Sequence, residues 1–415
     1  MANLTQTLPV EVILNAPNAR DLAQSLSLKV YQNLHDLEEL EPLWDNLVAD
    51  YPLASIFCTW EWLTSWWQSF GNRRNLLVLA LFDSASHLLG LAPLSISTEP
   101  FLGPFSLRLL RLMGDGSGDS DNLDFPVRPG FEEIFSGRIL EYLEDQRHQW
   151  DVSQLNTMPS ESPVARLLAN ALEEPRWTSF ESFRNCSAVP LPPNWDEYLQ
   201  HLSSEDQNNL VRYGRRLHKR YSVRIYRCLS EDELPVCLEA LFRLHQSRWQ
   251  RVGEAGTFSS AARRELYTDL SRRLLARNEL ELWVAELNGG IAAVQFAMRH
   301  KDKVYQLQEG YDPEHASDRV GFVLRGAVLK QLISEGIRVY DFLGGEDAFK
   351  ERWGAQAGCY RDLYFACSFS RGGVLLNCAQ GMVKTEQWLR ARLPSVWQVL
   401  HRIKLAWMQL REFET

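Results

Sequence analysis

The sequence predicts an α/β protein with mixed sheets, built as two similar halves. Segments with helical periodicity alternate with short β-rich runs, and each half contains one antiparallel hairpin. The opening of each half is also repeated: a strand, a polar start and a helix are predicted both in "VYQNLHDLEEL" (30–40) and in "IYRCLSEDEL" (225–234). The simplest interpretation is two related α/β domains.

In the first half, the helical patterns 37–51 and 61–70 precede a predicted hairpin over 76–96 with its turn at Asp83–His87. An apolar run, an acidic Gly/Ser/Asp loop (114–122), a helix, a strand and another helix follow. We therefore expect the order strand, helices, hairpin, strand, helix, strand, helix.

The second half shows the same order. Helical patterns over 234–250 and 261–277 precede a hairpin over 280–298, whose Asn288-Gly289-Gly290 turn is a strong hairpin signal. A strand (303–312), a helix (321–336), a strand (337–343) and the short helix of "EDAFKERWG" complete it. Prolines crowd near 186–199. We therefore predict domains at 1–190 and 191–373, and a helical tail at 374–415.

Composition narrows the function. With 415 residues, 45% hydrophobic and 23% charged, the chain has ordinary globular composition and room for two domains. The net charge of -9 argues against a DNA-binding protein. The seven cysteines are scattered and form no CxxC pair, which predicts neither a disulfide framework nor a zinc site. No apolar run is long enough to span a bilayer, and we expect a cytoplasmic protein that uses no metal.

Three stretches carry a family resemblance: "LFRLHQSRWQRVGEAGTF", "GYDPEH…GFVLRGAVL" and "YDFLGGEDAFKERWG". Together they resemble the CelD/BcsL-type acetyltransferases of the GNAT superfamily, which are related to the FemAB peptidyl transferases with their tandem GNAT-like domains. "FCTWEWLTSWWQSFG" (57–71) is similar to the same family's N-terminal signature. The resemblance covers about 30–370. It implies two tandem GNAT-like domains, the second catalytic, and acyl transfer from acyl-CoA to an amine or hydroxyl.

In this family the pyrophosphate of coenzyme A lies at the turn before the helix of 321–336. The resemblance therefore assigns cofactor binding to residues 319–323, which are Arg319, Val320, Gly321, Phe322 and Val323. Free backbone N–H groups and the helix dipole favour phosphate at such a turn. The family pattern is R/Q-x-x-G-x-G/A. This sequence departs from it, with Asp318 three residues before Gly321 and Val323 at the second small position.

An aspartate lies inside the apolar strand "RVYDFLG". Because a buried ionised carboxylate is costly unless it is paired or used, we take Asp341 as a candidate catalytic residue, together with Lys350. Glu346, one helical turn before Lys350, is a candidate for substrate binding. The alternatives are that Asp341 caps neighbouring backbone or pairs with an arginine, and that Lys350 is a solvated lysine. Phe349 replaces a tyrosine that protonates the leaving thiolate in the family.

Glu309 is the other candidate acid. On "YQLQEGY" a period of two places it on one face with Tyr305 and Tyr311. Many GNAT enzymes have a base on this strand, so the resemblance implies that role; the alternative is an exposed glutamate or one paired with an arginine. His245, Arg248 and Trp249 share a helix face and are candidates for binding the acceptor, or for packing between domains.

Two other functions stay open. Transfer from aminoacyl-tRNA, as in FemAB proteins, would require a basic groove, for which the basic run 208–227 is the candidate, although the acidic net charge disfavours tRNA. The departures at Asp318, Val323 and Phe349 are also compatible with a non-catalytic scaffold of polysaccharide assembly. In the tail, Trp397 and Trp407 with several arginines predict amphipathic helices; packing on the protein is commoner for such helices than contact with an anionic membrane.

Overall fold

The computed structural model describes residues 26–102, 105–251, 253, 255–345 and 348–392; within the last helix, side chains are described up to 381. Glu346 and the tail beyond 392, with Trp397 and Trp407, therefore lie outside the described residues. None of the described helices is long and apolar enough to cross a membrane.

The first half contains six strands and five α-helices among the described residues. The strands are β1 (Ser27–Tyr31), β2 (Arg74–Phe82), β3 (Leu88–Leu102), β4 (Phe105–Leu112), β5 (Val152–Pro159) and β6 (Trp177–Pro190). The helices are α3 (Leu34–Leu37), α4 (Glu41–Asp50), α5 (Trp60–Phe70), α6 (Glu132–Asp145) and α7 (Pro163–Ala171). The hairpin predicted over 76–96 is the β2–β3 pair.

The second half repeats this order. Its strands are β7 (Val223–Arg227), β8 (Leu280–Leu287), β9 (Gly290–His300), β10 (Lys303–Tyr311), β11 (Val339–Gly344) and β12 (Gln356–Cys367). Its helices are α8 (Trp195–His201), α9 (Ser204–Arg220), α10 (Leu234–Arg251), α11 (Ala261–Ala276), α12 (Val320–Ser334), α13 (Ala348–Glu351) and α14 (Arg371–Arg392). The predicted hairpin turn is present, with positive φ at Asn288 (53°) and Gly289 (85°). The predicted mixed α/β fold class is confirmed.

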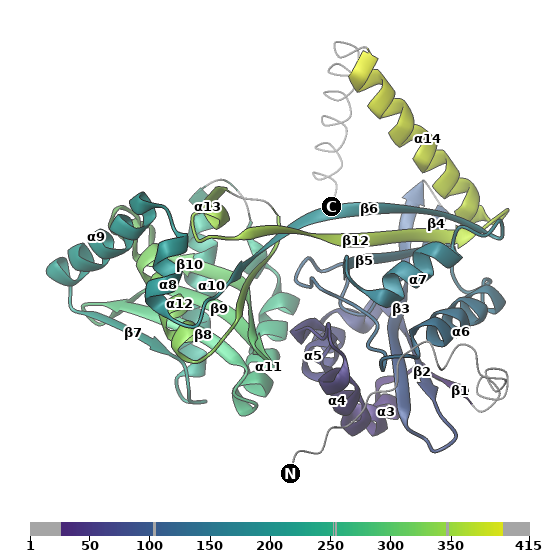
Figure 1. Cartoon of the computed structure of the whole chain (residues 1–415), viewed down its shortest axis with the longest axis horizontal. Coiled ribbons are helices and arrows are strands. Elements are labelled where there is room, and N and C mark those ends of the chain that lie inside the picture. Colours follow the sequence, from purple (N-terminus) through teal and green to yellow (C-terminus); the bar gives the residue numbers. More distant parts are fainter. Residues whose placement is uncertain (1–25, 103–104, 252, 254, 346–347, 393–415) are drawn as a thin grey trace.

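One feature of the sheet was not predicted. All twelve strands form one continuous sheet, in the order β1-β2-β3-β4-β5-β12-β6-β11-β10-β9-β8-β7. Strand β12, from the second half of the sequence, is inserted between β5 and β6 of the first half. Figure 1 shows β6 and β12 as a long antiparallel ribbon that crosses from one half to the other. The two halves are therefore joined by backbone hydrogen bonds as well as by side chains.

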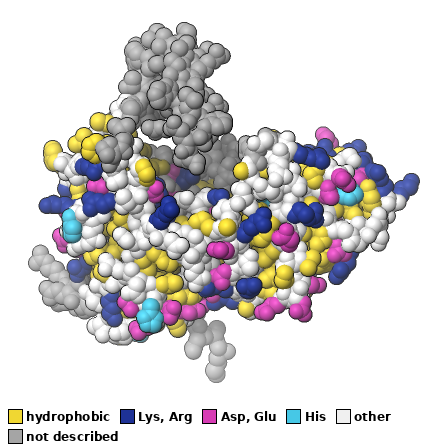
Figure 2. All heavy atoms as spheres, turned by 180° about the vertical axis from the view of Figure 1, so that it is seen from behind, with side chains coloured by type: hydrophobic (Ala, Val, Ile, Leu, Met, Phe, Trp, Pro, Cys, Tyr) yellow, Lys and Arg dark blue, Asp and Glu magenta, His cyan; other side chains and the backbone are white. Residues whose placement is uncertain are grey.

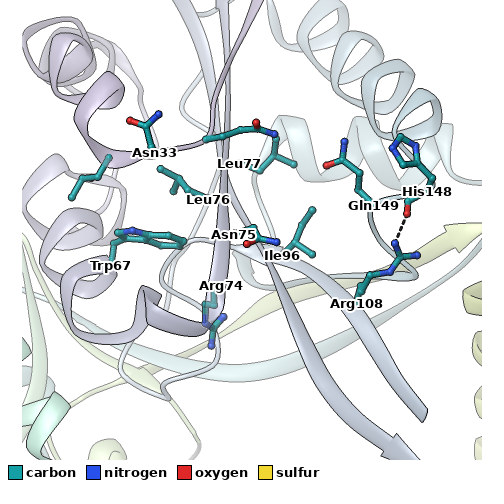
Figure 3. Close-up of a pocket in the computed structure, with 12 residues that line it drawn as sticks. Asn33, Trp67, Arg74, Asn75, Leu76, Leu77, Ile96, Arg108, His148 and Gln149 are labelled. Carbon is teal, nitrogen blue, oxygen red and sulfur yellow. Dashed lines mark hydrogen bonds between the residues drawn. The ribbon is translucent and has the colours of Figure 1, made fainter. Parts of the chain in front are cut away.

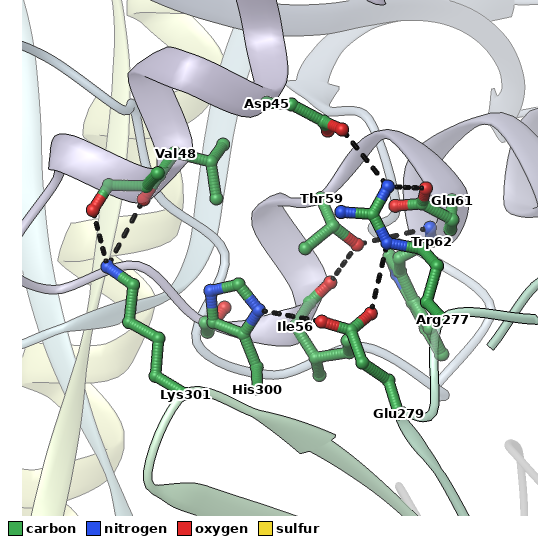
Figure 4. A network of polar contacts seen from close by, with 12 residues as sticks. Asp45, Val48, Ile56, Thr59, Glu61, Trp62, Arg277, Glu279, His300 and Lys301 are labelled. Atoms are coloured by element: carbon green, nitrogen blue, oxygen red, sulfur yellow. Dashed lines mark hydrogen bonds and ion pairs between the residues drawn. The ribbon is translucent and has the colours of Figure 1, made fainter.

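Side chains add a polar network between the halves (Figure 4). Arg277, at the end of α11, donates to Asp45 (3.0 Å) and Glu61 (2.6 Å) of the first half. Burial raises the pKa of Glu61, and the Arg277 guanidinium opposes that shift. Lys301 Nζ donates to three carbonyls at the end of α4, those of Val48, Ala49 and Tyr51. The network fixes the first half against the second around the cleft between them.

Candidate active site

The N-terminus of α12 has the geometry of an anion site. Arg319, the residue before the helix, is left-handed (φ 59°, ψ 36°), and its side chain does not cap the helix. The Val323 amide is bonded to the Arg319 carbonyl (3.0 Å), so the uncommitted amides of this first turn belong to Val320, Gly321 and Phe322. Three N–H groups and the positive end of the dipole thus point out of the helix start, where a phosphate would be stabilised.

A cavity of about 300 Å³ opens at this helix start. Its lining residues come from α10, β10, α12, α13 and the segments beside them: Arg248, Glu309, Tyr311, Ala316, Arg319, Val320, Gly321, Phe322, Arg325, Phe349, Arg352 and Trp353. The structure therefore brings together six residues that the sequence proposed, namely Arg248, Glu309 and residues 319–322. Four arginines against one glutamate make the cavity positive. Val323 instead packs into the core of the second half.

Glu309 is bound by two arginines. Arg325, which is only 1% exposed, donates to Glu309 Oε2, and Arg248 lies 3.7 Å from Oε1. The Arg325 guanidinium also lies over the rings of Phe349 (4.6 Å), Phe342 (5.3 Å) and Trp353 (5.6 Å). These contacts hold Glu309 in its ionised form, which makes it a structural anion rather than a strong base.

Sequence reasoning missed Arg325. A signal was available, because the arginine interrupts the apolar run "VGFVLRGAVL" at the position where a helix buries its side chain. Sequence reasoning also placed Tyr305 and Glu309 on one face. That prediction is wrong, because the pairing of β10 with β9 shifts register between Gln306 and Gln308. After this bulge Glu309 faces α12, whereas the Tyr305 ring contacts Phe57 of the first half.

His245 and Trp249 do not line the cavity. Trp249 Nε1 donates to His245 Nε2 (2.9 Å), and the imidazole, 3% exposed, packs edge-on against Phe258. Burial, helped by the nearby charge of Arg248, lowers the pKa of His245 to about 4. The imidazole is therefore neutral at pH 7, and its place in the core matches the packing role.

Asp341 and Lys350 lie at the end of β11. Asp341 Oδ1 accepts from the Leu343 amide (2.7 Å), and Asn122 Nδ2, from the first half, lies 3.4 Å from Oδ2. Lys350 Nζ reaches back to the carbonyls of Gly344 (2.7 Å) and Gly345 (2.9 Å). The ammonium thus closes the turn that follows β11. Asp341 faces the first half, on the side of the sheet opposite the cavity.

Asp318, the departure from the family pattern, is turned away from the cavity. Its carboxylate accepts from Arg216 (3.0 Å) and Tyr221 (2.9 Å), and it is also bound by Arg220. These contacts tie the loop before α12 to α9. Two arginines of the basic run 208–227 are thereby neutralised, and a third, Arg227, pairs with Glu281 (3.0 Å).

The first half has a separate groove of about 780 Å³ (Figure 3). Of the tryptophans in α5, Trp60, Trp62 and Trp66 are buried core residues, whereas Trp67 is half-buried and lines this groove. The groove's lining contains amide side chains, two arginines and His148, but no carboxylate. It therefore lacks the acid–base pair that the first half would need for acyl transfer of its own.

Comparisons with known proteins agree with this geometry. Residues 204–351 match the model of an acetyltransferase (GNAT) domain. Among solved structures, FemX superposes with a TM-score of 0.56 at 12% identity, over 81% of this chain and 96% of that chain. A search of curated proteins found no match.

Two further structures are similar at lower scores. A tandem GNAT protein from the clavulanic acid biosynthesis pathway has a TM-score of 0.43 at 12% identity, over 82% of this chain and 98% of that one. L-PGS from Bacillus licheniformis has a TM-score of 0.43 at 13% identity, over 76% and 93%. At these scores neither bears on function. The chain thus has the overall fold of FemX, two GNAT-like halves in one sheet, with an acetyltransferase (GNAT) domain in its second half.

Proposed function

We propose that the second half carries the active site of an acyltransferase that uses acyl-CoA and acts on an amine or a hydroxyl. The observation that carries the proposal is the cavity at the start of α12, where free amides and Arg319 face the same space as Arg248 and Arg352. Amides at a helix start are suited to a pyrophosphate, and the arginines to further phosphate oxygens. Aromatic side chains at Tyr311 and Phe349 offer an apolar wall for the rest of the ligand.

The second support is the path from this cavity through the sheet. Strands β10 and β11 are paired only at Lys303–Val339, Val304–Tyr340 and Tyr305–Asp341, although both strands continue further. Beyond Tyr305 and Asp341 the two strands separate. An acyl group held on the α12 side can therefore reach the opposite face of the sheet between them, where the first half supplies the wall.

Calorimetric titration of the full chain with acetyl-CoA tests the proposal. Arg319→Asp is the informative variant: aspartate tolerates the left-handed backbone and favours a helix start, so the fold is retained while a negative charge meets the phosphates. We expect the affinity for acetyl-CoA to fall at least tenfold. Arg338→Asp, an exposed charge reversal outside the cavity lining, should leave the affinity unchanged. Absence of binding by the wild type would refute the proposal.

Transfer from aminoacyl-tRNA is the second candidate, because the fold is that of FemX. The charges of the described residues favour it less. Arg216, Arg220 and Arg227 of the basic run are paired with carboxylates, and the face in Figure 2 shows acidic and basic side chains interspersed. Filter binding of tRNA over a salt series decides: a steep loss of affinity with salt would favour tRNA over acyl-CoA.

The pathway follows from the resemblance alone. We propose an acceptor from polysaccharide or cell-envelope biosynthesis, such as an amino sugar precursor. An acceptor with an amino group fits the acyl chemistry of the domain model, and the following inference develops that choice from the opposite face of the sheet.

A further inference from the structure

The face of the sheet opposite the cavity is covered by a loop of the first half. This loop, residues 113–124, follows β4 and is rich in Gly, Ser and Asp. Asp121 Oδ2 accepts from the amide of Gly344 (2.9 Å), at the end of β11. Asn122, in a left-handed conformation (φ 50°), donates to Tyr360 Oη (3.1 Å) and lies 3.4 Å from Asp341 Oδ2. The loop thus meets the point at which β10 and β11 separate.

The side chains here alternate with those of the cavity. Phe342 faces α12, where it lies under Arg325, so Asp341 must face the other way. Arg184, Cys186 and Tyr360 share the Asp341 face, as the register of β6 with β11 and β12 requires. Asp121 and Asp341 are each half-buried, so both remain accessible to a small substrate. The cavity and this group of side chains are therefore the two ends of one passage through the sheet.

Asp121 has the protonation behaviour of a base near neutral pH. Burial raises its pKa to about 6, and the Asp341 carboxylate adds to the rise, while the Gly344 amide, Arg184 and Lys350 oppose it. Burial also raises the pKa of Asp341, against the Leu343 amide, Lys303, Asn122 and Lys350. The neighbouring thiol of Cys186, whose pKa burial raises to about 12, stays neutral and offers no nucleophile. Glu309, by contrast, is committed to Arg325 and Arg248.

We infer that Asp121, from the first half, is the catalytic base of the proposed transferase, and that Asp341 orients the amino group of the acceptor beside it. This inference rests on the function proposed above. The neutral amine attacks the thioester carbon, a C–N bond forms and the C–S bond breaks. One proton of the attacking nitrogen passes to the Asp121 carboxylate, and the leaving thiolate takes a proton from solvent. The acceptor is thereby assigned to the primary amines, and the active site requires both halves.

The test measures release of the CoA thiol by the full-length protein with acetyl-CoA and each of four amines: glucosamine, galactosamine, putrescine and Nα-acetyl-lysine. We expect at least one amine to stimulate release, with a rate that falls as the pH drops below about 6, because protonated Asp121 accepts no proton. Asp121→Asn should lower the amine-dependent kcat roughly 100-fold. The asparagine oxygen still accepts the Gly344 amide, so the acetyl-CoA affinity should be unchanged.

Asp115→Asn is the matched control. Asp115 lies in the same loop, but its carboxylate accepts from Asn156 within the first half, so we expect wild-type rates. An Asp121→Asn variant that keeps the wild-type rate and pH profile would overturn the inference. It would also be overturned if the wild type bound acetyl-CoA and no amine stimulated thiol release. Failure of the wild type to bind acetyl-CoA would instead overturn the proposed function.

Discussion

Replacing Gly310 by alanine is expected to lower the free energy of unfolding by about 3 kcal/mol, because it overpacks a rigid contact. A Cβ at Gly310 would lie 2.6 Å from the backbone nitrogen of His245 and 2.9 Å from the carbonyl carbon of Leu244. These are backbone atoms of α10, so relief requires the helix to move away from β10. Glu309 and Tyr311 flank the glycine and line the cavity, so the same substitution should also weaken acetyl-CoA binding.

Urea unfolding of the variant measures this effect. Gly137→Ala is the matched control, because Gly137 is exposed within α6 and its added Cβ meets nothing within 4 Å. That change should raise the stability by about 0.5–1 kcal/mol, the usual gain of alanine over glycine in a helix. Equal stabilities for wild type and Gly310→Ala would show that α10 does not pack on β10 as described.

Replacing Arg325 by methionine is expected to cost about 3 kcal/mol and to disturb the cavity. Methionine fills much of the same volume against Phe342, Phe349 and Trp353, but it leaves Glu309 with only the longer contact to Arg248. Breaking a buried pair by removing one partner typically costs 3–5 kcal/mol, and the partial exposure of Glu309 favours the lower end.

The comparison variant is Arg352→Met. Arg352 also lines the cavity, but its ion pair with Asp206 is half-exposed, so its loss should cost less than about 1 kcal/mol. Thermal or denaturant unfolding of both variants distinguishes the two pairs. If Arg325→Met were as stable as Arg352→Met, the Arg325–Glu309 pair would not hold the cavity together.

Local patterns were enough to predict most of the fold. Both hairpins and the helix start at Gly321 carry short-range signals: alternation, an Asn-Gly turn and a glycine before an apolar helix. The β6–β12 ribbon carries none. Its charged residues, among them Asp362, mask a strand pattern, because Asp362 is buried only through its pairing with Arg184 from the partner strand. A pairing between residues so far apart in the sequence leaves no local mark.

The same limit applies to the candidate site. The sequence predicted the helix start together with Arg248 and Glu309, since segments 244–249, 305–311 and 318–323 each carried a recognisable pattern. It did not place Asp341 and Glu309 on opposite faces, because one bulge in β10 reverses the alternation. Nor did it connect Asp121 to Gly344, a contact that exists only once the two halves have joined.

A crystal structure of the full chain with CoA tests the central claim most directly, namely that the passage between β10 and β11 is the site of acyl transfer. The account predicts pyrophosphate oxygens bonded to the amides of Gly321 and Phe322, with the thiol directed between the strands toward Asp341 and Asp121. CoA bound elsewhere, for example in the groove beside Trp67, would contradict it, as would a thiol that points to solvent on the α12 side.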